Sequence, residues 1–303
     1  MELRQLRYFI KAAQTLNFSQ ASKELFITQS TLSQQIHQLE KELGLLLFQR
    51  NSHEMTLTEA GEELLPYARR TVNSADTCID RIVDLRKLLC GNLNIGVTYS
   101  FSSIMTDTLI EFMRKYPKVK LNICYSTMED LMLKLQAHEL DFVLAFKPTR
   151  RYDKIESHVL FNNRLAVIVK DNHTLAKEQK ITLEDLQRYD LALPAGGLQA
   201  RNALEFMLSR KDFDYNVHIE LNDVNILLKL IRETNYVTVL SESTIHNELG
   251  LKSIPIDSPY ADMEGCIHIL KGAYIKNSAQ EFIRLLSQST AIWQNSSLAD
   301  LFS

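Results

Sequence analysis

Hydrophobic residues recur at helical spacing in three short segments at the start of the chain. The first helical stripe consists of Leu6, Phe9, Ile10, Ala13 and Leu16, which predicts an amphipathic helix. Asn17 breaks this pattern, and a second helix is expected from Phe18. A third helix should follow Thr28, a good N-cap residue, and end at Gly44, a residue type that favours the left-handed C-cap.

The polar face of the predicted third helix is rich in amide and hydroxyl groups, whereas an ordinary solvated face would be richer in Lys and Glu. Gln can bond adenine in the major groove, and Ser or Thr can contact base edges or phosphates. A short helix, a tight turn and a helix with such a face predict a helix-turn-helix that reads DNA. The predicted DNA-binding residues of this helix are Gln29, Ser30, Thr31, Ser33, Gln34 and His37. The alternative is a three-helix bundle with a polar exterior.

The segment after Gly44 predicts a wing, which is a two-stranded flap beside the recognition helix. The apolar run from Leu45 to Phe48 is expected to pack under the helices, and Met55 to Thr58 to return as a short strand. Arg50, at the turn between them, is placed to contact a DNA phosphate. Its alternative role is that of a solvated surface side chain.

Residues 59–89 are expected to form one long helix, with Thr58 as its cap. Apolar residues recur along it at steps of three and four, and only Arg86 interrupts the series. Such a heptad seam favours pairing with a second copy of the chain, although packing against its own chain is the alternative. The seam consists of Leu65, Ala68, Val72, Ala75, Ile79, Ile82 and Leu89.

From Gly91 onward the pattern changes to apolar strands that alternate with helices. Examples are the strands expected at 93–99, 119–125 and 140–146, and the helix expected from Ser102 to Tyr116. This alternation predicts an α/β fold with parallel sheets of the doubly wound kind.

Composition narrows the function classes. The chain has 303 residues, 45% hydrophobic and 23% charged, with a net charge of -3, so any DNA contact must be local. Four scattered cysteines include no Cys-x-x-Cys pair, and no catalytic motif, cofactor site or metal site is apparent. The chain begins without signal-peptide features and has no membrane-length apolar run, so we expect a cytoplasmic protein that is not an enzyme.

The residues from Leu3 to Gly61 resemble, without a gap, the DNA-binding domain of the LysR-type transcriptional regulators. In that family Ser30 is often Pro, and Gln34 and His37 are often Arg. The resemblance implies a winged helix-turn-helix at 1–58, a linker and dimerisation helix at 59–89 and an effector-binding domain at 90–303. It also implies a homodimer, commonly assembled into a tetramer, that binds double-stranded DNA, with RNA polymerase as a further candidate partner.

The effector domain of this family is similar to the periplasmic solute-binding proteins, with a ligand cleft between two α/β lobes. The resemblance implies a first lobe of about 91–160 and 266–303 and a second of about 161–265. Ligands of open α/β sheets bind beyond the carboxyl ends of strands, where helix N-termini offer free amides. The predicted ligand-binding residues lie at such strand ends and are Thr98, Ser100, Phe101, Ser102, Thr127, Lys147, Gly196 and Gly197.

These cleft residues favour a polar or anionic small-molecule effector, while Tyr99 and Phe101 would tolerate an aromatic one. The alternative for each hydroxyl is a helix cap. At the level of function, the leading hypothesis is an effector-controlled, sequence-specific transcriptional regulator. The alternatives are a small-molecule binding module without specific DNA readout, and an enzyme that carries a DNA-binding arm.

Overall fold

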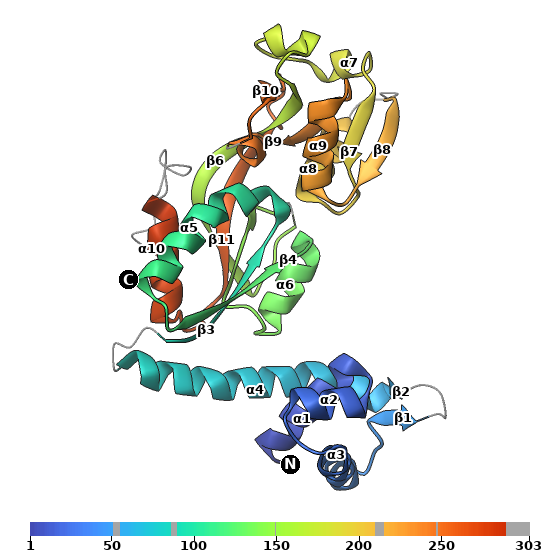
Figure 1. Ribbon diagram of the computed structural model, residues 1–303, viewed down its shortest axis with the longest axis vertical. Helices are drawn as coiled ribbons and strands as arrows, with labels where there is room; N and C mark the ends of the chain where they lie inside the picture. Colours follow the sequence, from blue (N-terminus) through green and yellow to red (C-terminus); the bar gives the residue numbers. More distant parts are fainter. Residues whose placement is uncertain (51–54, 86–89, 149, 210–214, 247, 289–303) are drawn as a thin grey trace. The chain divides into compact units, whose positions relative to one another are not determined.

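The computed structural model describes residues 1–50, 55–85, 90–148, 150–209, 215–246 and 248–288. The chain forms two compact units, one built essentially from residues 1–86 and the other from most of the residues that follow. Each unit is described by itself below (Figure 1). None of the described helices is long and apolar enough to cross a membrane.

The first unit is a winged helix followed by a long helix. Its elements are α1 (Leu3–Thr15), α2 (Phe18–Glu24), α3 (Gln29–Leu43), β1 (Phe48–Arg50), β2 (Met55–Leu57) and α4 (Glu59–Leu85). The Asn17 side chain accepts a hydrogen bond from the Gln20 amide and begins α2, and Gly44 ends α3 with a φ of 71°. These caps confirm the helices expected from the hydrophobic pattern.

The core of the winged helix is centred on Phe48, the first residue of β1. Its ring centroid lies 5.6 Å from that of Phe9 and 5.5 Å from that of Phe18, both in edge-to-face arrangements. The apolar run before it is only half buried, because Leu47 is 1% exposed whereas Leu45 and Leu46 are exposed. The expectation that the whole run packs under the helices was therefore wrong for its first half.

The wing is joined closely to the start of α4. Strands β1 and β2 pair antiparallel, with Phe48 opposite Leu57. The Thr58 amide donates to the Leu47 carbonyl at 3.0 Å. A Cβ atom at Gly61 would lie 2.2 Å from the Leu47 carbonyl oxygen, so only glycine allows this approach.

The long helix α4 uses its apolar seam in two ways. Ala68 and Val72 are buried in the winged-helix core, where α4 packs against α1, so the alternative of packing within the chain holds for this half. Ile79 and Ile82 are exposed. Leu89, the last residue of the predicted seam, lies outside the described residues.

The second unit contains α/β elements joined by two long strands. Its strands are β3 (Gly91–Val97), β4 (Val119–Tyr125), β5 (Phe142–Phe146), β6 (Ile155–Lys170), β7 (Leu191–Pro194), β8 (Val217–Leu221), β9 (Thr238–Ser241), β10 (Leu251–Pro255) and β11 (Asp262–Leu270). Its α-helices are α5 (Ser102–Lys115), α6 (Met128–Gln136), α7 (Leu183–Leu186), α8 (Gln199–Leu208), α9 (Val224–Glu233) and α10 (Asn277–Gln288). Its 3₁₀ helices are η1 (Tyr99–Phe101), η2 (Thr174–Lys177) and η3 (Glu242–Ile245).

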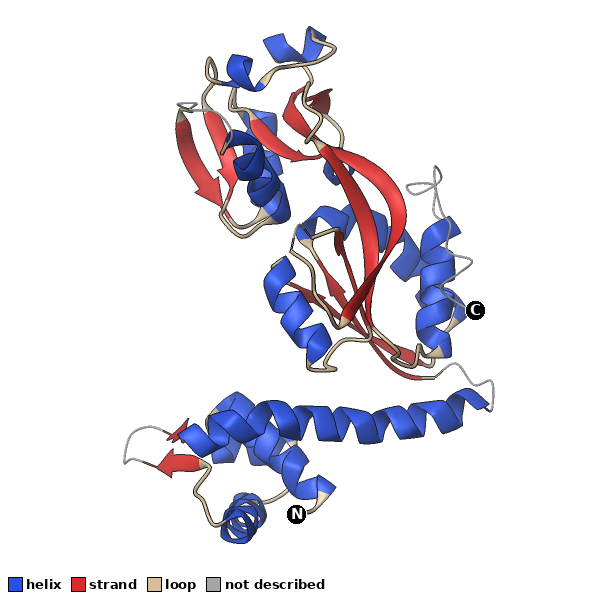
Figure 2. Cartoon of the chain, turned by 180° about the vertical axis from the view of Figure 1, so that it is seen from behind, coloured by secondary structure: helices blue, strands red, loops and turns tan. Residues whose placement is uncertain are grey.

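The main sheet has the strand order β10-β6-β11-β5-β3-β4, and β9 also pairs with β6. Strand β3 pairs parallel with β4 and β5, and β7 pairs parallel with β8. The long strands β6 and β11 run antiparallel to each other and connect the two lobes (Figure 2). The expectation of parallel sheets therefore holds within the lobes, while the connecting strands make the main sheet mixed.

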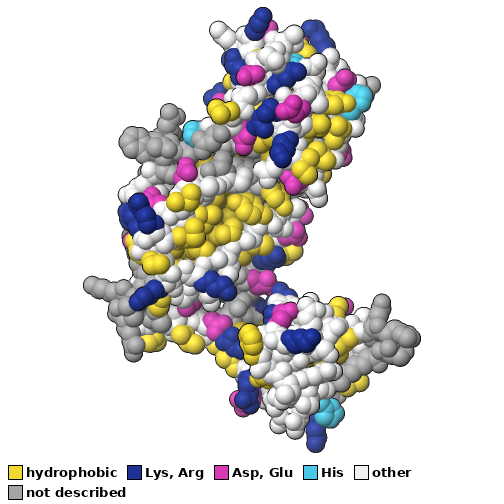
Figure 3. All heavy atoms as spheres, in the orientation of Figure 1, with side chains coloured by type: hydrophobic (Ala, Val, Ile, Leu, Met, Phe, Trp, Pro, Cys, Tyr) yellow, Lys and Arg dark blue, Asp and Glu magenta, His cyan; other side chains and the backbone are white. Residues whose placement is uncertain are grey.

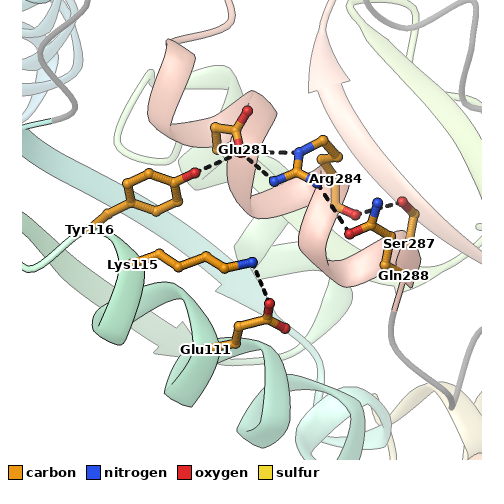
Figure 4. A network of polar contacts seen from close by, with 7 residues as sticks. All are labelled: Glu111, Lys115, Tyr116, Glu281, Arg284, Ser287 and Gln288. Atoms are coloured by element: carbon orange, nitrogen blue, oxygen red, sulfur yellow. Dashed lines mark hydrogen bonds and ion pairs between the residues drawn. The ribbon is translucent and has the colours of Figure 1, made fainter.

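Helices α5 and α10 lie side by side on the first lobe and share a polar network (Figure 4). The Tyr116 hydroxyl donates to Glu281 at 2.9 Å, and the Arg284 guanidinium donates to the same carboxylate at 2.8 Å. Beneath it, Phe112 and Phe282 pack with ring centroids 5.2 Å apart. The C-terminal helix thus completes the lobe that begins at β3.

Candidate DNA-reading helix and effector cleft

Helix α3 separates an apolar stripe from a polar face. Leu32, Ile36 and Leu39 are fully buried in the winged-helix core. On the other side Gln29, Ser30, Thr31, Gln34 and His37 are exposed and Ser33 is half-buried. The predicted DNA-binding face of this helix is therefore accessible along its length. Arg50 ends β1, and its side chain lies outside the described part of the chain.

Local hydrogen bonds orient the first turn of α3. Thr28 accepts from the Thr31 amide at 3.1 Å, and its hydroxyl also bonds those of Ser30 and Thr31. Ser19 on α2 donates to Gln29 Oε1 at 2.9 Å. The Gln29 amide is thus held through its oxygen, and its nitrogen carries two N–H donors that a base could accept.

A buried carboxylate fixes the wing to α3. Glu40 of α3 is 5% exposed, and its Oε1 accepts from the amides of Leu47 at 2.8 Å and Phe48 at 3.3 Å. Sequence reasoning missed this role. The available signal was Glu40 directly after Leu39 of the apolar stripe, where a buried charge requires partners.

In the second unit, a cleft lies between the two lobes, at the carboxyl ends of β3, β4 and β7 and the N-terminus of α8. One wall comes from the first lobe and the other from the second. The lining residues are Thr98, Tyr99, Ser100, Ser126, Thr127, Met128, Pro194, Gly197, Leu198, Gln199, Ala200, Val224 and Leu240. None of them is charged, so the cleft offers hydroxyls, amides and apolar surface.

Four of the predicted effector residues line this cleft: Thr98, Ser100, Thr127 and Gly197. Thr98 and Ser100 are nearly buried, and Thr127 is half-buried. Gly197 has a φ of 87° and lies across the cleft, where a Cβ would be 3.9 Å from Thr127 Cγ2. The strand-end rule therefore predicted four residues that line this cleft, and their contact with an effector stays a prediction.

The other four predicted residues are placed elsewhere. Phe101 is fully buried, and its ring packs 5.1 Å from that of Phe146, because η1 turns it back into the first-lobe core. The Ser102 hydroxyl donates to the Tyr99 carbonyl at 2.8 Å. Gly196 is exposed and does not line the cleft. Lys147 lines a different pocket and forms an ion pair with Glu264.

Gln199 bridges the two lobes beside the cleft. Its Nε2 donates to the Phe146 carbonyl at 2.9 Å, and its Oε1 accepts from the Phe146 amide at 3.0 Å. Phe146 ends β5 in the first lobe, whereas Gln199 begins α8 in the second. No sequence signal indicated this contact, because it joins residues 53 positions apart.

The cleft is nearly closed in this structure. Its cavity volume is about 10 Å³, roughly the room that one water molecule needs. The Tyr99 ring stacks on the Tyr125 ring at 5.7 Å between centroids, and burial raises the pKa of Tyr125. A ligand larger than water therefore requires the walls to move apart.

Comparison with known proteins covers both units. Residues 3–62 match the bacterial regulatory helix-turn-helix domain of the LysR family, and residues 86–291 match the LysR substrate binding domain. The chain belongs to the LysR family. The resemblance seen in the sequence is thus confirmed, and with it the prediction of a LysR-type transcriptional regulator with an effector-binding domain.

Individual LysR proteins are similar over most of the chain. The transcriptional activator CmpR of Synechocystis is 30% identical to this chain, over a match that covers 87% of this chain and 85% of CmpR. CbnR complexed with its target DNA has a TM-score of 0.67 at 21% identity, covering 94% and 99%. The regulatory domain of Synechocystis CcmR in complex with 2-PG has a TM-score of 0.58 at 22% identity, covering 65% and 96%.

LysR proteins are regulators rather than enzymes. No cluster of His, Cys, Asp and Glu that could hold a metal ion occurs among the described residues. Burial raises the pKa of the Cys266 thiol to about 12, so this cysteine carries little thiolate at neutral pH.

Proposed function

We propose that this LysR-type regulator reads its operator with the exposed face of α3. The observation that carries the proposal is the division of α3 into a fully buried apolar stripe and an exposed row of amides and hydroxyls. Gln29, oriented by Ser19, would donate to base acceptors in the major groove. The structure of CbnR in complex with its target DNA supports the same use of this domain. Because it would act on bacterial DNA, we place it in the cytoplasm.

The interlobe cleft is the proposed effector site. Thr98, Ser100 and Thr127 face it from the first lobe, and Gly197 from the second. Such a lining suits a small polar ligand that accepts and donates several neutral hydrogen bonds. The complex of the CcmR regulatory domain with 2-PG supports small-molecule binding by the matching domain.

Effector entry would be coupled to opening of the cleft. The closed form, with room for about one water molecule, is bridged by the Gln199 hydrogen bonds to Phe146. A ligand that fits only the open form would shift the population toward it. This gives the effector a structural change to impose on the regulator.

Exposed apolar side chains support the proposed homodimer. Ile79 and Ile82 extend the seam of α4 beyond the winged-helix core. In the second unit, hydrophobic side chains gather over α5 and β4, including Ile110, Met113 and Tyr125 (Figure 3). Two such surfaces per chain would allow dimers to pair into a tetramer, while RNA polymerase stays a predicted partner without a surface assigned to it.

Replacing Gln29 by alanine tests the DNA-reading proposal. We expect specific binding to weaken by about fivefold or more, because one good base contact contributes about 1–3 kcal/mol of discrimination. The measurement is fluorescence anisotropy with the DNA upstream of the protein's own gene and a scrambled duplex, at two salt concentrations. Gln187→Ala, which removes an exposed amide from the second unit, is the control.

Equal specific affinity of Gln29→Ala and the parent would remove Gln29 from the interface. Equal, salt-sensitive binding of the parent to both duplexes would favour the alternative, a small-molecule binding module without specific readout.

A further inference from the structure

A second pocket of the effector unit lies at the loop between β5 and β6 and the first residues of β6. Its cavity volume is about 270 Å³, far more than that of the closed cleft. The lining residues are Lys147, Pro148, Arg150, Arg151, Tyr152, Ile155 and Ser157. All of them belong to one short stretch of chain in the first lobe, so the pocket does not depend on lobe closure.

The charge of this pocket is strongly positive. Lys147, Arg150 and Arg151 line it, and none of its lining residues is acidic. Glu264 pairs with Lys147 and, through this hydrogen bond, raises the pKa of that lysine. Among the described residues no carboxylate is seen paired with either arginine. Asp153 and Glu156 belong to the same stretch of chain but do not line the pocket, so its lining keeps an excess of positive charge for a ligand to neutralise.

Tyr152 lies against one of the two arginines of the pocket. The Arg150 guanidinium lies 5.9 Å from the centroid of the Tyr152 ring, which favours a cation–π contact and limits its freedom. Arg150 and Arg151 are both exposed. Guanidinium groups bind carboxylate and phosphate oxygens in bidentate fashion.

Ser157 contributes an acceptor to the wall. The ring of His268 lies between Ser157 Oγ, 2.8 Å from Nδ1, and the Ala145 carbonyl, 3.2 Å from Nε2. Nε2 must carry the proton toward that carbonyl, so in the neutral ring Nδ1 accepts from the Ser157 hydroxyl. The proton of Ser157 is thereby used, and its oxygen keeps a lone pair for a donor on the ligand.

We propose that this pocket binds a small organic dianion, a phosphate monoester or a dicarboxylate, that also carries a hydroxyl or amine donor. The two arginines would hold the anionic groups, and Ser157 would accept from the donor. The volume admits a metabolite-sized molecule and excludes a large polymer segment. This anion site is separate from the uncharged interlobe cleft, in which the effector is proposed to bind.

The test is a calorimetric titration of the full-length protein with two probes, inorganic phosphate and malate, in phosphate-free buffer. Acetate serves as the monoanion control. We expect saturable binding of at least one dianion, weakened by about tenfold or more in an Arg150→Gln, Arg151→Gln double variant. Arg150→Lys, which keeps the charge but loses the bidentate geometry, should bind the dianion with an affinity between those of the parent and the double variant.

Two control variants distinguish this pocket from the cleft and from diffuse charge. Arg188→Gln removes an exposed cation elsewhere in the unit, and Ser100→Ala alters the cleft; both should bind the dianion as the parent does. The proposal is overturned if neither probe saturates, if the double variant binds as tightly as the parent, or if Ser100→Ala loses binding equally. Thermal unfolding of each variant confirms that it is folded.

Discussion

The two pockets of the effector unit differ in almost every physical respect, although they meet at the end of one strand. The cleft has a volume of about 10 Å³, takes its walls from both lobes and contains no charged side chain. The loop pocket has about 270 Å³, belongs to one lobe and carries three cations. Phe146, bonded to Gln199 at the cleft, is followed directly by Lys147 of the loop pocket.

This difference indicates how each pocket would select a ligand. Neutral hydroxyls and amides recognise the shape and hydrogen-bond pattern of a ligand once water is excluded, which suits a cleft that closes. Cations on an open loop recognise charge, and salt screens their attraction. One domain therefore offers a site that depends on conformation and a site that depends on charge.

The largest effect is expected from Phe101, which supports the cleft wall from behind. Replacing it by alanine should destabilise the effector unit by about 3–5 kcal/mol, because a large buried ring is lost from a packed core. Urea unfolding followed by circular dichroism measures the change. Phe26→Ala, which truncates a ring that is 95% exposed, is the matched control and should cost less than about 0.5 kcal/mol. A small effect of Phe101→Ala would contradict the core position of this ring and favour the original prediction that Phe101 lines the cleft.

The position of Phe101 shows where sequence reasoning reached its limit. The strand ends and the hydroxyls after them were predictable, because apolar strands alternate with helices along the second unit. The direction of each side chain was not, since η1 sends Ser100 to the cleft and the next residue to the core. Lys147 likewise follows a strand as expected, but its loop forms a pocket of its own.

The elements that were predicted and those that were missed differ in how clearly the local sequence marks them. The first half of β6 was not predicted, because polar residues such as Ser157 and Asn162 interrupt its apolar pattern. Lys252 and Ser253 interrupt the pattern of β10 in the same way. The helices of the winged unit were predicted closely, because caps such as Asn17, Thr28 and Gly44 mark their ends in the sequence. Contacts between distant segments, such as Gln199 with Phe146, leave no local signal.

Gln199 tests whether the cleft depends on lobe closure. Gln199→Ala removes both hydrogen bonds to Phe146, which should bias the lobes toward opening by about 1–3 kcal/mol at a net 0.5–1.5 kcal/mol for each bond. Hydrogen exchange of the Phe146 amide should accelerate by about fivefold or more. Dianion binding to the loop pocket should stay unchanged, because that pocket lies within one lobe. Unchanged exchange would mean that other contacts hold the cleft closed.

The last prediction concerns the loop pocket. His268 lies behind this pocket, and the cleft has no corresponding buried histidine among its lining residues. Burial lowers its pKa from 6.5 to about 4, and the Ala145 hydrogen bond opposes this only in part. As the pH falls below 6.5, His268 of the unfolded chain takes up a proton before His268 of the folded chain does. The free energy of unfolding therefore decreases between about pH 6.5 and pH 4, and His268 causes no further decrease below pH 4. Between pH 7 and pH 5 this loss amounts to about 2 kcal/mol.

The variant His268→Gln keeps a donor toward Ala145 but does not titrate, so its unfolding free energy should fall by about 2 kcal/mol less than that of the parent over this range. Burial also lowers the pKa values of His138 and His173. Both proteins share those contributions, and the difference between them therefore isolates His268. Parallel pH profiles would show that the pKa of His268 is the same in the folded and unfolded chain, so that the folded ring becomes charged below about pH 6.5. In that case Nδ1 would donate to Ser157, and the Ser157 hydroxyl would become a donor to the bound anion instead of an acceptor from the ligand.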